Sequence, residues 1–181
     1  MAQATGALRL KSEAASYNRD EWLYGLDLVD LIVPLALSTG VVACRAPLPG
    51  ERDTLCAWRR AYDMEALGAA DTEETRLRSA RSLDQQIADG NAWIALEHAA
   101  PVSLSSFNAV LPDIVQLGGI YTPPELRGRG FARVAVAASL VAARERGAER
   151  AVLFTSNPSA ARAYEALGFL RIGGYAVTLF R

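Results

Sequence analysis

Residues 121–133 read YTPPELRGRGFAR and connect an apolar run, residues 114–121, to a segment whose apolar residues recur at helical spacing. The two consecutive prolines stop the apolar run, so the segment predicts a strand, a turn and the start of a helix. The first N–H groups of a helix have no intrahelical partners, and the positive end of the helix dipole lies there. Gly128 and Gly130 allow a phosphate to approach that main chain closely. The turn is therefore a candidate anion site.

The same turn has an ordinary alternative, which is a helix entry with solvated arginines. It lacks the Lys-Ser/Thr of a Walker loop, and its glycines do not follow the Gly-x-Gly-x-x-Gly pattern of a dinucleotide fold. If a phosphate binds, Arg127 and Arg129 add fixed charge and hydrogen-bond donors. The turn alone does not decide between the two interpretations.

A second segment, residues 155–169, reads TSNPSAARAYEALGF and predicts a short helix over residues 158–167. Asn157 is a good N-cap, Pro158 suits the first helical position, and glycine follows the last turn. Two helical turns separate Asn157 from Tyr164, so the amide and the phenol can face one ligand. The alternative is that Tyr164 packs in the core and Asn157 only caps the helix.

Together the two segments resemble the GCN5-related N-acetyltransferase (GNAT) family. Arg127-x-x-Gly130-x-Ala132 is similar to the family's acetyl-CoA pyrophosphate motif, Gln/Arg-x-x-Gly-x-Gly/Ala. Residues 157–160 and residues 164–169 are similar to its second motif. The wording of residues 119–130 resembles the FR47-like branch, and the resemblance extends over about residues 41–181.

The resemblance implies an α/β (α+β) fold: a mixed, mostly antiparallel sheet of about six to seven strands, a central β-α-β unit that binds acyl-CoA, and helices on both faces. The strands on either side of the central helix are implied to splay apart around the pantetheine arm of acetyl-CoA. Tyr164 would give a proton to the departing CoA thiolate, and no covalent enzyme intermediate is implied. The residues implied to contact acetyl-CoA are Ile120, Tyr121, Thr122, Arg127, Gly128, Arg129, Gly130, Phe131, Ala132, Arg133, Asn157, Ala160 and Tyr164.

The general base and the substrate contacts are less defined. Glu65, Glu97 and Asn108 are the candidate substrate residues, and His98 is a further candidate base. The ordinary alternatives are solvated glutamates and a surface histidine. A nucleophilic pair of Cys56 and His98 lacks the third group that would orient it.

The remaining segments alternate between strand and helix. We expect strands at residues 24–33, 41–45, 91–97, 102–110, 114–121, 151–155, 169–172 and 176–180, and helices at residues 49–65, 71–89, 130–146 and 158–167. Short turns predict antiparallel pairing of the three central strands, whereas residues 114–121 and 151–155 should pair in parallel through a right-handed crossover. Gly118-Gly119 is consistent with a bulge, and Gly173-Gly174 separates the last two strands.

Composition favours a soluble enzyme. The chain has 181 residues, about half of them apolar, and a net charge of −1, so it can bury one sizeable core and offers no broad basic field for nucleic acid. Two isolated cysteines indicate neither a disulfide framework nor a zinc site, so no metal is expected and a cytoplasmic location fits. No signal peptide or membrane span is expected.

We expect residues 1–40 to be an extension that packs on the sheet, and residues 41–181 to be the catalytic domain. We expect the protein to be a bacterial monomer or homodimer.

These observations favour an acetyl-CoA-dependent N-acetyltransferase that acts on a primary amine of a small molecule, an amino-acid-like metabolite or a peptide. The first alternative is a catalytically silent domain that binds or senses acyl-CoA, which would not need the phenol of Tyr164. The second is a different nucleotide-binding enzyme.

Overall fold

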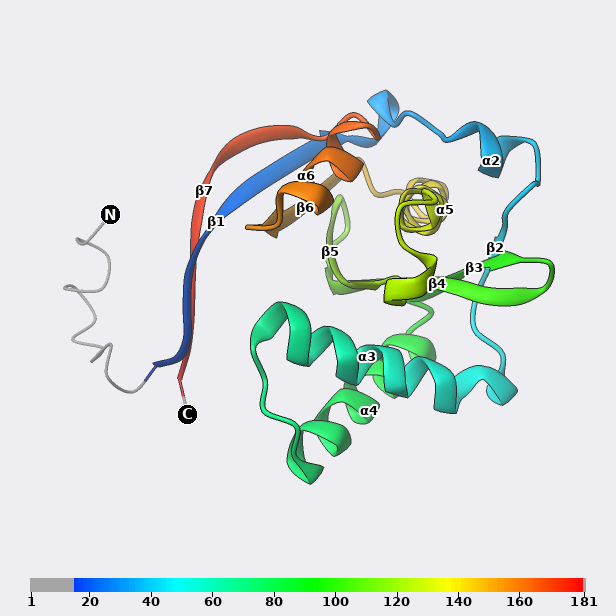
Figure 1. Ribbon diagram of the computed structural model, residues 1–181. Helices are drawn as coiled ribbons and strands as arrows, with labels where there is room; N and C mark the ends of the chain where they lie inside the picture. The colour runs from blue at the N-terminus through cyan, green and yellow to red at the C-terminus, as the bar shows by residue number, and fades with distance from the viewer. Residues whose placement is uncertain (1–14, 181) are drawn as a thin grey trace.

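The computed structural model describes residues 15–180, which fold into one seven-stranded sheet with helices on both faces (Figure 1). In chain order the elements are β1 (Ala15–Asp27), η2 (Leu28–Asp30), α2 (Leu35–Ser38), β2 (Ala43–Arg45), η3 (Pro49–Glu51), α3 (Arg52–Leu67), α4 (Glu73–Ala88), β3 (Ala92–Glu97), β4 (Ala100–Val110), β5 (Ile114–Tyr121), η4 (Pro124–Leu126), α5 (Phe131–Glu145), β6 (Arg150–Thr155), α6 (Pro158–Glu165) and β7 (Leu170–Phe180).

The strand order in the sheet is β2-β3-β4-β5-β6-β1-β7. Every neighbouring pair is antiparallel except β5 and β6, which pair in parallel across the crossover helix α5. The predicted antiparallel meander and the central β-α-β unit are both confirmed.

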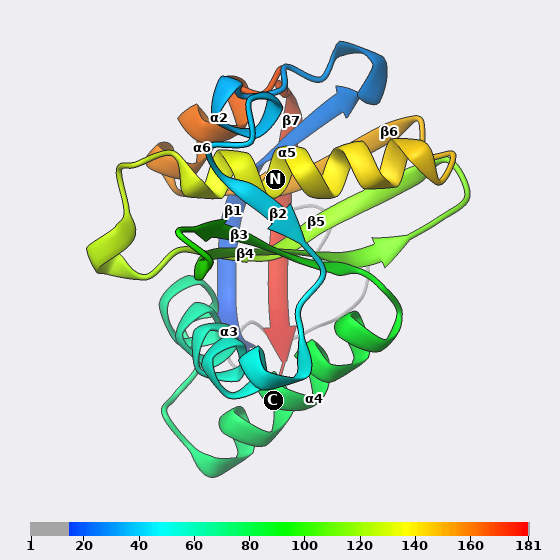
Figure 2. The same ribbon diagram turned by 90° about the vertical axis from the view of Figure 1, so that its right-hand side faces the viewer.

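Two helical layers enclose the sheet. Helices α2, α5 and α6 lie on one face, and α3 and α4 lie on the other (Figure 2). Leu140 of α5 packs with Phe107 and Leu153 of the sheet in the largest core cluster. On the opposite face, Leu55 of α3 and Leu83 of α4 pack with β3 and β4. β3 lies between these two layers, and its buried residues 92–96 form a continuous apolar run.

The parallel pairing between β5 and β6 is short. Only residues 114–116 of β5 pair with residues 150–152 of β6, and beyond that point the two strands are not hydrogen-bonded to each other. In the same half of β5 the register against β4 shifts after Gly118, and Gly119 has a φ of +67°. The predicted bulge is therefore confirmed, and the opening of the sheet lies beside it.

The structure corrects two strand predictions at the edge of the sheet. The expected strand at residues 24–33 is instead β1, which starts earlier and ends at Asp27, where the chain turns into η2. The two expected C-terminal strands are one strand, β7, because Gly173 and Gly174 pair with Leu23 and Trp22 of β1. β1 thus lies within the sheet, between β6 and β7, and the two strands extend as a long ribbon (Figure 1). The division into residues 1–40 and 41–181 stays a prediction, and residues 1–14 lie outside the described residues.

Candidate active site

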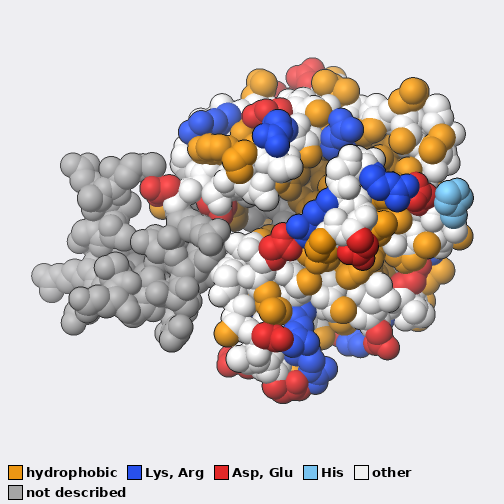
Figure 3. All heavy atoms as spheres, in the orientation of Figure 1, with side chains coloured by type: hydrophobic (Ala, Val, Ile, Leu, Met, Phe, Trp, Pro, Cys, Tyr) orange, Lys and Arg blue, Asp and Glu red, His pale blue; other side chains and the backbone are white. Residues whose placement is uncertain are grey.

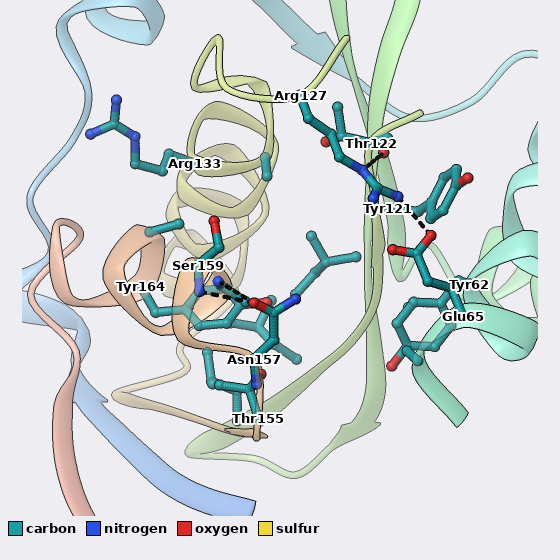
Figure 4. Close-up of a pocket in the computed structure, with 18 of the residues that line it drawn as sticks. Tyr62, Glu65, Tyr121, Thr122, Arg127, Arg133, Thr155, Asn157, Ser159 and Tyr164 are labelled. Atoms are coloured by element: carbon teal, nitrogen blue, oxygen red, sulfur yellow. Dashed lines mark hydrogen bonds and ion pairs between the residues drawn. The ribbon is translucent and has the colours of Figure 1, made fainter. Parts of the chain in front are cut away.

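A cavity of about 780 Å³ opens where β5 and β6 separate. One wall comes from α3 and β5, and the other comes from the end of β6 and the start of α6 (Figure 4). The space-filling view shows this face hollowed between the α5–α6 part and the α3–α4 part, with basic side chains along the edge (Figure 3). Both motifs singled out in the sequence meet at this cavity.

The glycine-rich loop supplies the end of the cavity at the N-terminus of α5. Gly128 and Gly130 both have left-handed backbone conformations, with φ of +77° and +84°. No side chain caps the N-terminus of α5, so its first N–H groups have no side-chain partner. Gly130, Phe131, Ala132 and Arg133 all line the cavity. This end therefore offers unpartnered donors and a positive helix end to an anion.

The three arginines of the loop differ in position. Arg127 lines the cavity, donates from Nε to the carbonyl of Thr122 at 2.9 Å, and pairs with Glu65 at 2.7 Å. Arg133 lines the cavity and is exposed. Arg129 does not line it, because its guanidinium pairs with Glu97 at 2.6 Å. The structure thus brings Arg127 and Arg133 to the cavity and leaves Arg129 outside.

The strand β5 contributes main-chain groups on the other side of the loop. Gly119, Ile120, Tyr121 and Thr122 all line the cavity. Gly119 and Ile120 fall in the register shift against β4 and beyond the last pairing with β6, so their main chain belongs to neither ladder. The hydroxyl of Thr122 is occupied by Ser103 at 2.8 Å. An extended ligand in the opening would therefore meet main-chain donors and acceptors of β5.

Asn157 lies on the opposite wall as the N-cap of α6. Its Oδ1 accepts from the N–H of Ser159 at 2.8 Å and from that of Ala160 at 3.3 Å. Because the oxygen is used for capping, the amide nitrogen is the free end of the side chain. It points away from α6 into the cavity (Figure 4). The predicted cap is confirmed, and the amide nitrogen is positioned to meet a ligand.

Tyr164 lines the cavity from α6 and is 9% exposed. Its ring packs against Phe169 edge to face, with 6.0 Å between centroids. Burial, and to a smaller degree the nearby Tyr62, raises the pKa of the Tyr164 phenol above its ordinary value. The phenol therefore keeps its proton at neutral pH.

Tyr62 of α3 faces Tyr164 from the opposite wall (Figure 4). Burial also raises the pKa of the Tyr62 phenol, while a hydrogen bond from the N–H of Gly119 lowers it. The positive charge of Arg59 also lowers the pKa of Tyr62, and the negative charges of Asp63 and Glu21 contribute smaller increases. The phenol of Tyr62 thus lies beside the bulge of β5.

A buried polar network holds this part of α3 against the sheet. Arg59 pairs with Asp63 at 3.2 Å and donates to Gln86 of α4 at 3.1 Å. Ser79 donates to Asp63 at 2.5 Å. A Cβ on Gly119 would lie 3.0 Å from the Arg59 guanidinium, so the bulge and the network are in close contact. The Arg59 guanidinium also lies over the Tyr62 ring, 5.5 Å from its centroid, so this network contacts Tyr62 as well.

Of the candidate substrate residues, some line the cavity and others do not, as with the arginines of the loop. Glu65 lines the cavity, whereas Glu97 and Asn108 do not. The side chain of Asn108 covers the Cα of Gly118 and accepts a hydrogen bond from Gln86 at 3.4 Å. His98 lies in the exposed β3–β4 turn, at the edge of the molecule far from the hollow (Figure 3).

Sequence reasoning missed Glu21 and Tyr62 as cavity residues. Both line the cavity, and Tyr62 lies within the expected helix at residues 49–65 without a motif that marks it as a site residue. Glu21 lies on β1, whose position in the sheet has no local signal. Among the described residues no group of His, Cys, Asp and Glu side chains could hold a metal ion. No helix within residues 15–180 is long and apolar enough to cross a membrane.

Comparison with known proteins gives a consistent result. A family model described as the acetyltransferase (GNAT) family matches residues 55–169. No curated protein matches the chain significantly.

Solved structures share the fold at low identity. A GCN5-related N-acetyltransferase from Kribbella flavida is 22% identical with a TM-score of 0.63, over 90% of this chain and 58% of that chain. An acetyltransferase from the GNAT family of Colwellia psychrerythraea is 13% identical with a TM-score of 0.66, over 97% of this chain and 62% of that chain. A predicted acetyltransferase with acetyl-CoA from Clostridium acetobutylicum is 18% identical with a TM-score of 0.58, over 72% of this chain and 91% of that chain. The chain spans only about three fifths of the length of the first two proteins.

Proposed function

Since the chain belongs to the acetyltransferase (GNAT) family, we propose that it transfers an acetyl group from acetyl-CoA directly to a primary amine. The observation that carries this proposal is the opening between β5 and β6, which joins the uncapped N-terminus of α5 to the buried phenol of Tyr164 in one cavity. A long ligand with an anionic part and a reactive end matches that combination.

The residues around the cavity fit acetyl-CoA. The N–H groups at residues 130–133 would hold the pyrophosphate, with Arg127 and Arg133 nearby. The main chain of Ile120 and the amide nitrogen of Asn157 would hold the pantetheine arm from opposite walls. Acetyl-CoA supplies an activated thioester carbonyl, which a neutral amine can attack without a covalent enzyme intermediate. The C–N bond forms and the C–S bond breaks; the nitrogen releases one proton to solvent, and the departing thiolate takes one from the enzyme.

Tyr164 is the general acid in this proposal. A tyrosine phenol holds its proton at neutral pH, burial raises the pKa of Tyr164 further, and the residue lines the cavity in which the sulfur would leave. A main-chain N–H of the β5 bulge would donate to the carbonyl oxygen as negative charge develops on it. Tyr62 lies beside the same bulge, where it accepts a hydrogen bond from the N–H of Gly119. The proposal gives it no proton transfer.

The alternative is a silent domain that binds or senses acyl-CoA. The alternative explains the glycine-rich loop, but it gives no reason for a phenol that lines the cavity opposite a second phenol. We therefore favour the enzyme. We also retain the FR47-like branch, a cytoplasmic location and a monomer or homodimer as parts of the proposal; the free thiols of Cys44 and Cys56 support a reducing compartment.

A screen of primary amines with acetyl-CoA tests the proposal by release of free thiol. Wild-type protein is expected to release thiol with at least one class of amine. Tyr164→Phe is expected to lower single-turnover rates on the order of 10²-fold, while acetyl-CoA affinity measured by calorimetry stays unchanged. Acetyl-CoA binding without thiol release across all amine classes would favour the silent domain. Unchanged turnover in Tyr164→Phe would remove Tyr164 from the acid role.

A further inference from the structure

Two leucines close the inner end of the cavity, one on each of the diverging strands. Leu117 follows Gln116 on β5 and Leu153 follows Val152 on β6, so they are the first residues beyond the last parallel pair. Both line the cavity, yet they are only 3% and 2% exposed. The cavity therefore reaches these two residues and ends at them.

The two leucines are held in place on the sides that face away from the cavity. Leu117 pairs with β4 and Leu153 pairs with β1, so each strand keeps one ladder where the other is lost. Both belong to the core cluster that also contains Tyr164. Further in, Val115 and Ala151 are buried in the same cluster and do not line this cavity. A group that extended past the leucines would have to displace close-packed core side chains, which is unfavourable.

Next to Leu117, strand β5 presents only main chain. Gly118 and Gly119 separate Leu117 from Ile120, so no β5 side chain projects between these two residues. Ile120 and Gly119 both line the cavity. A small group that lies beside the two glycines therefore meets the Leu117 side chain next.

The length of the proposed cofactor carries its acyl group to this point. If the pyrophosphate binds at residues 130–133, the pantetheine arm runs inward along β5 from Thr122. About eleven chain atoms separate the pyrophosphate from the sulfur, and a residue contributes three, so the arm is about as long as four residues of strand. Four residues inward from Thr122 is Gly118. The acyl group then lies beside Gly118 and against Leu117.

We propose that Leu117 and Leu153 limit the acyl group of the donor to acetyl or propanoyl. The two side chains contact the end of a short acyl group, and the added carbons of a longer one would overlap with them. Since both leucines are fixed in paired strands, they do not move aside easily. This inference rests on the proposed function and names its donor class and two specificity-determining residues.

The first test measures binding of acyl-CoA donors to wild-type protein by calorimetry, without an amine, so this readout does not require turnover. Affinities are expressed relative to CoA, which has no acyl group. Acetyl-CoA and propanoyl-CoA should bind within about fourfold of each other, the effect of one buried methylene. Butanoyl-CoA should bind at least about tenfold more weakly than acetyl-CoA, because overpacking costs more than the added methylenes gain. Equal affinities for acetyl-CoA and butanoyl-CoA would overturn the inference.

Variants of the two leucines test their part in this limit. Leu117→Ala shortens the side chain to a methyl group and should raise the affinity for butanoyl-CoA, relative to acetyl-CoA, on the order of tenfold. Leu140→Ala is the matched control, because Leu140 is buried in the same cluster on α5 and does not line the cavity. It should lose a similar amount of stability and keep the acyl preference of wild type.

Leu153→Val carries the test if Leu117→Ala does not fold, because the smaller change costs less stability. It should raise the same affinity ratio by about fourfold. An unchanged ratio in a folded leucine variant, or an equal change in Leu140→Ala, contradicts the proposed limit.

Turnover separates this inference from the proposed function. With an amine that releases thiol, kcat/KM for butanoyl-CoA relative to acetyl-CoA should rise in Leu117→Ala in parallel with the affinity ratio. A limit in binding that depends on Leu117, without thiol release from any amine, supports the limit and removes the proposed transfer. Thiol release by wild-type protein that is equally efficient with butanoyl-CoA and acetyl-CoA keeps the transfer and overturns the limit.

Discussion

Gln116 of β5 and Val152 of β6 are the last paired residues of the only parallel ladder among the described strands. Beyond them the two strands diverge, and residues of both line the cavity. The main chain of β5 is left without a partner strand on that side. A ligand that inserts there gains hydrogen bonds that the protein itself does not make.

This relationship predicts where acetyl-CoA protects the main chain. Peptides that cover residues 117–121 should exchange amide hydrogens more slowly when acetyl-CoA is added, by up to about 100-fold at a ligand concentration of about 100 times Kd. β3 has partner strands on both sides, so it should show little change and serves as the internal control. Equal protection of β3 and residues 117–121 would indicate general stabilisation rather than contact with β5.

The loop glycine Gly130 gives the second prediction. Valine at position 130 would have to adopt an unfavourable left-handed backbone conformation. Its Cβ would also lie only 3.1 Å from Nη2 of Arg133. Gly130→Val should weaken acetyl-CoA binding by tenfold or more, because the side chain obstructs the approach of the pyrophosphate to the main chain.

Gly147→Val is the matched control for this prediction. Gly147 also has a positive φ, but it lies after α5 in open space and outside the cavity. Both variants should lose about 1–2 kcal/mol of stability from backbone strain, and only Gly130→Val should lose affinity. Calorimetry and urea unfolding separate the two effects; equal affinity in both folded variants would exclude the loop from the binding site.

The fold was predictable wherever the signal is local. The prolines after Tyr121 end β5 at that residue, and Asn157-Pro158 start α6 as expected. The bounds of β1 and β7 were wrong because each strand is defined by a partner at the other end of the chain. The glycines at 173 and 174 suggested a break, yet pairing with β1 keeps the strand continuous. Register between distant strands leaves little trace in either segment alone.

In the candidate site too, the residues with a local signal were predictable and the others were not. Gly130 marks a turn before a helix and Asn157 a helix N-cap, and both residues line the cavity. Arg129 and Glu97 also looked suitable, but their opposite charges pair with each other outside it. The place of Glu21 in the cavity wall depends on the insertion of β1 between β6 and β7, which no local pattern reveals.

The raised pKa of Tyr164 predicts a specific loss of stability at alkaline pH. Below about pH 10 the phenol is protonated in both states, so its contribution to stability is fully present. Above this pH the unfolded chain releases the proton while the folded protein retains it, and the free energy of unfolding falls by up to about 1.4 kcal/mol per pH unit. In urea unfolding, wild-type protein should therefore lose stability relative to Tyr164→Phe as pH rises above about 10. Tyr62 is present in both proteins, so its own titration largely cancels in the difference between their free energies of unfolding. If that difference stayed constant as pH rises, Tyr164 would have the same pKa in the folded and unfolded states.

The turn between β3 and β4 predicts a stabilising change. His98 and Ala99 have φ of 49° and 65°, which is unfavourable for residues with a side chain and typical of the turn that prefers Asn-Gly. Ala99→Gly should raise the free energy of unfolding by about 0.5–1 kcal/mol and Tm by about 1–3 °C. His98→Asn should also stabilise the turn and leave turnover unchanged, because His98 is outside the cavity. Loss of turnover in His98→Asn would restore His98 as a candidate base.

Asn157→Ser separates capping from ligand binding at the start of α6. Serine is also a good N-cap, so it can accept from the N–H of Ala160 or Ser159 in place of Oδ1, and stability should change little. Serine has no amide nitrogen to reach into the cavity. If that nitrogen donates to the pantetheine arm, the lost hydrogen bond should cost roughly 0.5–1.5 kcal/mol in acetyl-CoA binding, or about two- to twelvefold in affinity. Asn157→Ala loses both roles, so it should show the same loss of affinity together with about 1 kcal/mol of lost stability. Equal affinity and equal melting temperature in Asn157→Ser would leave Asn157 as a helix cap alone.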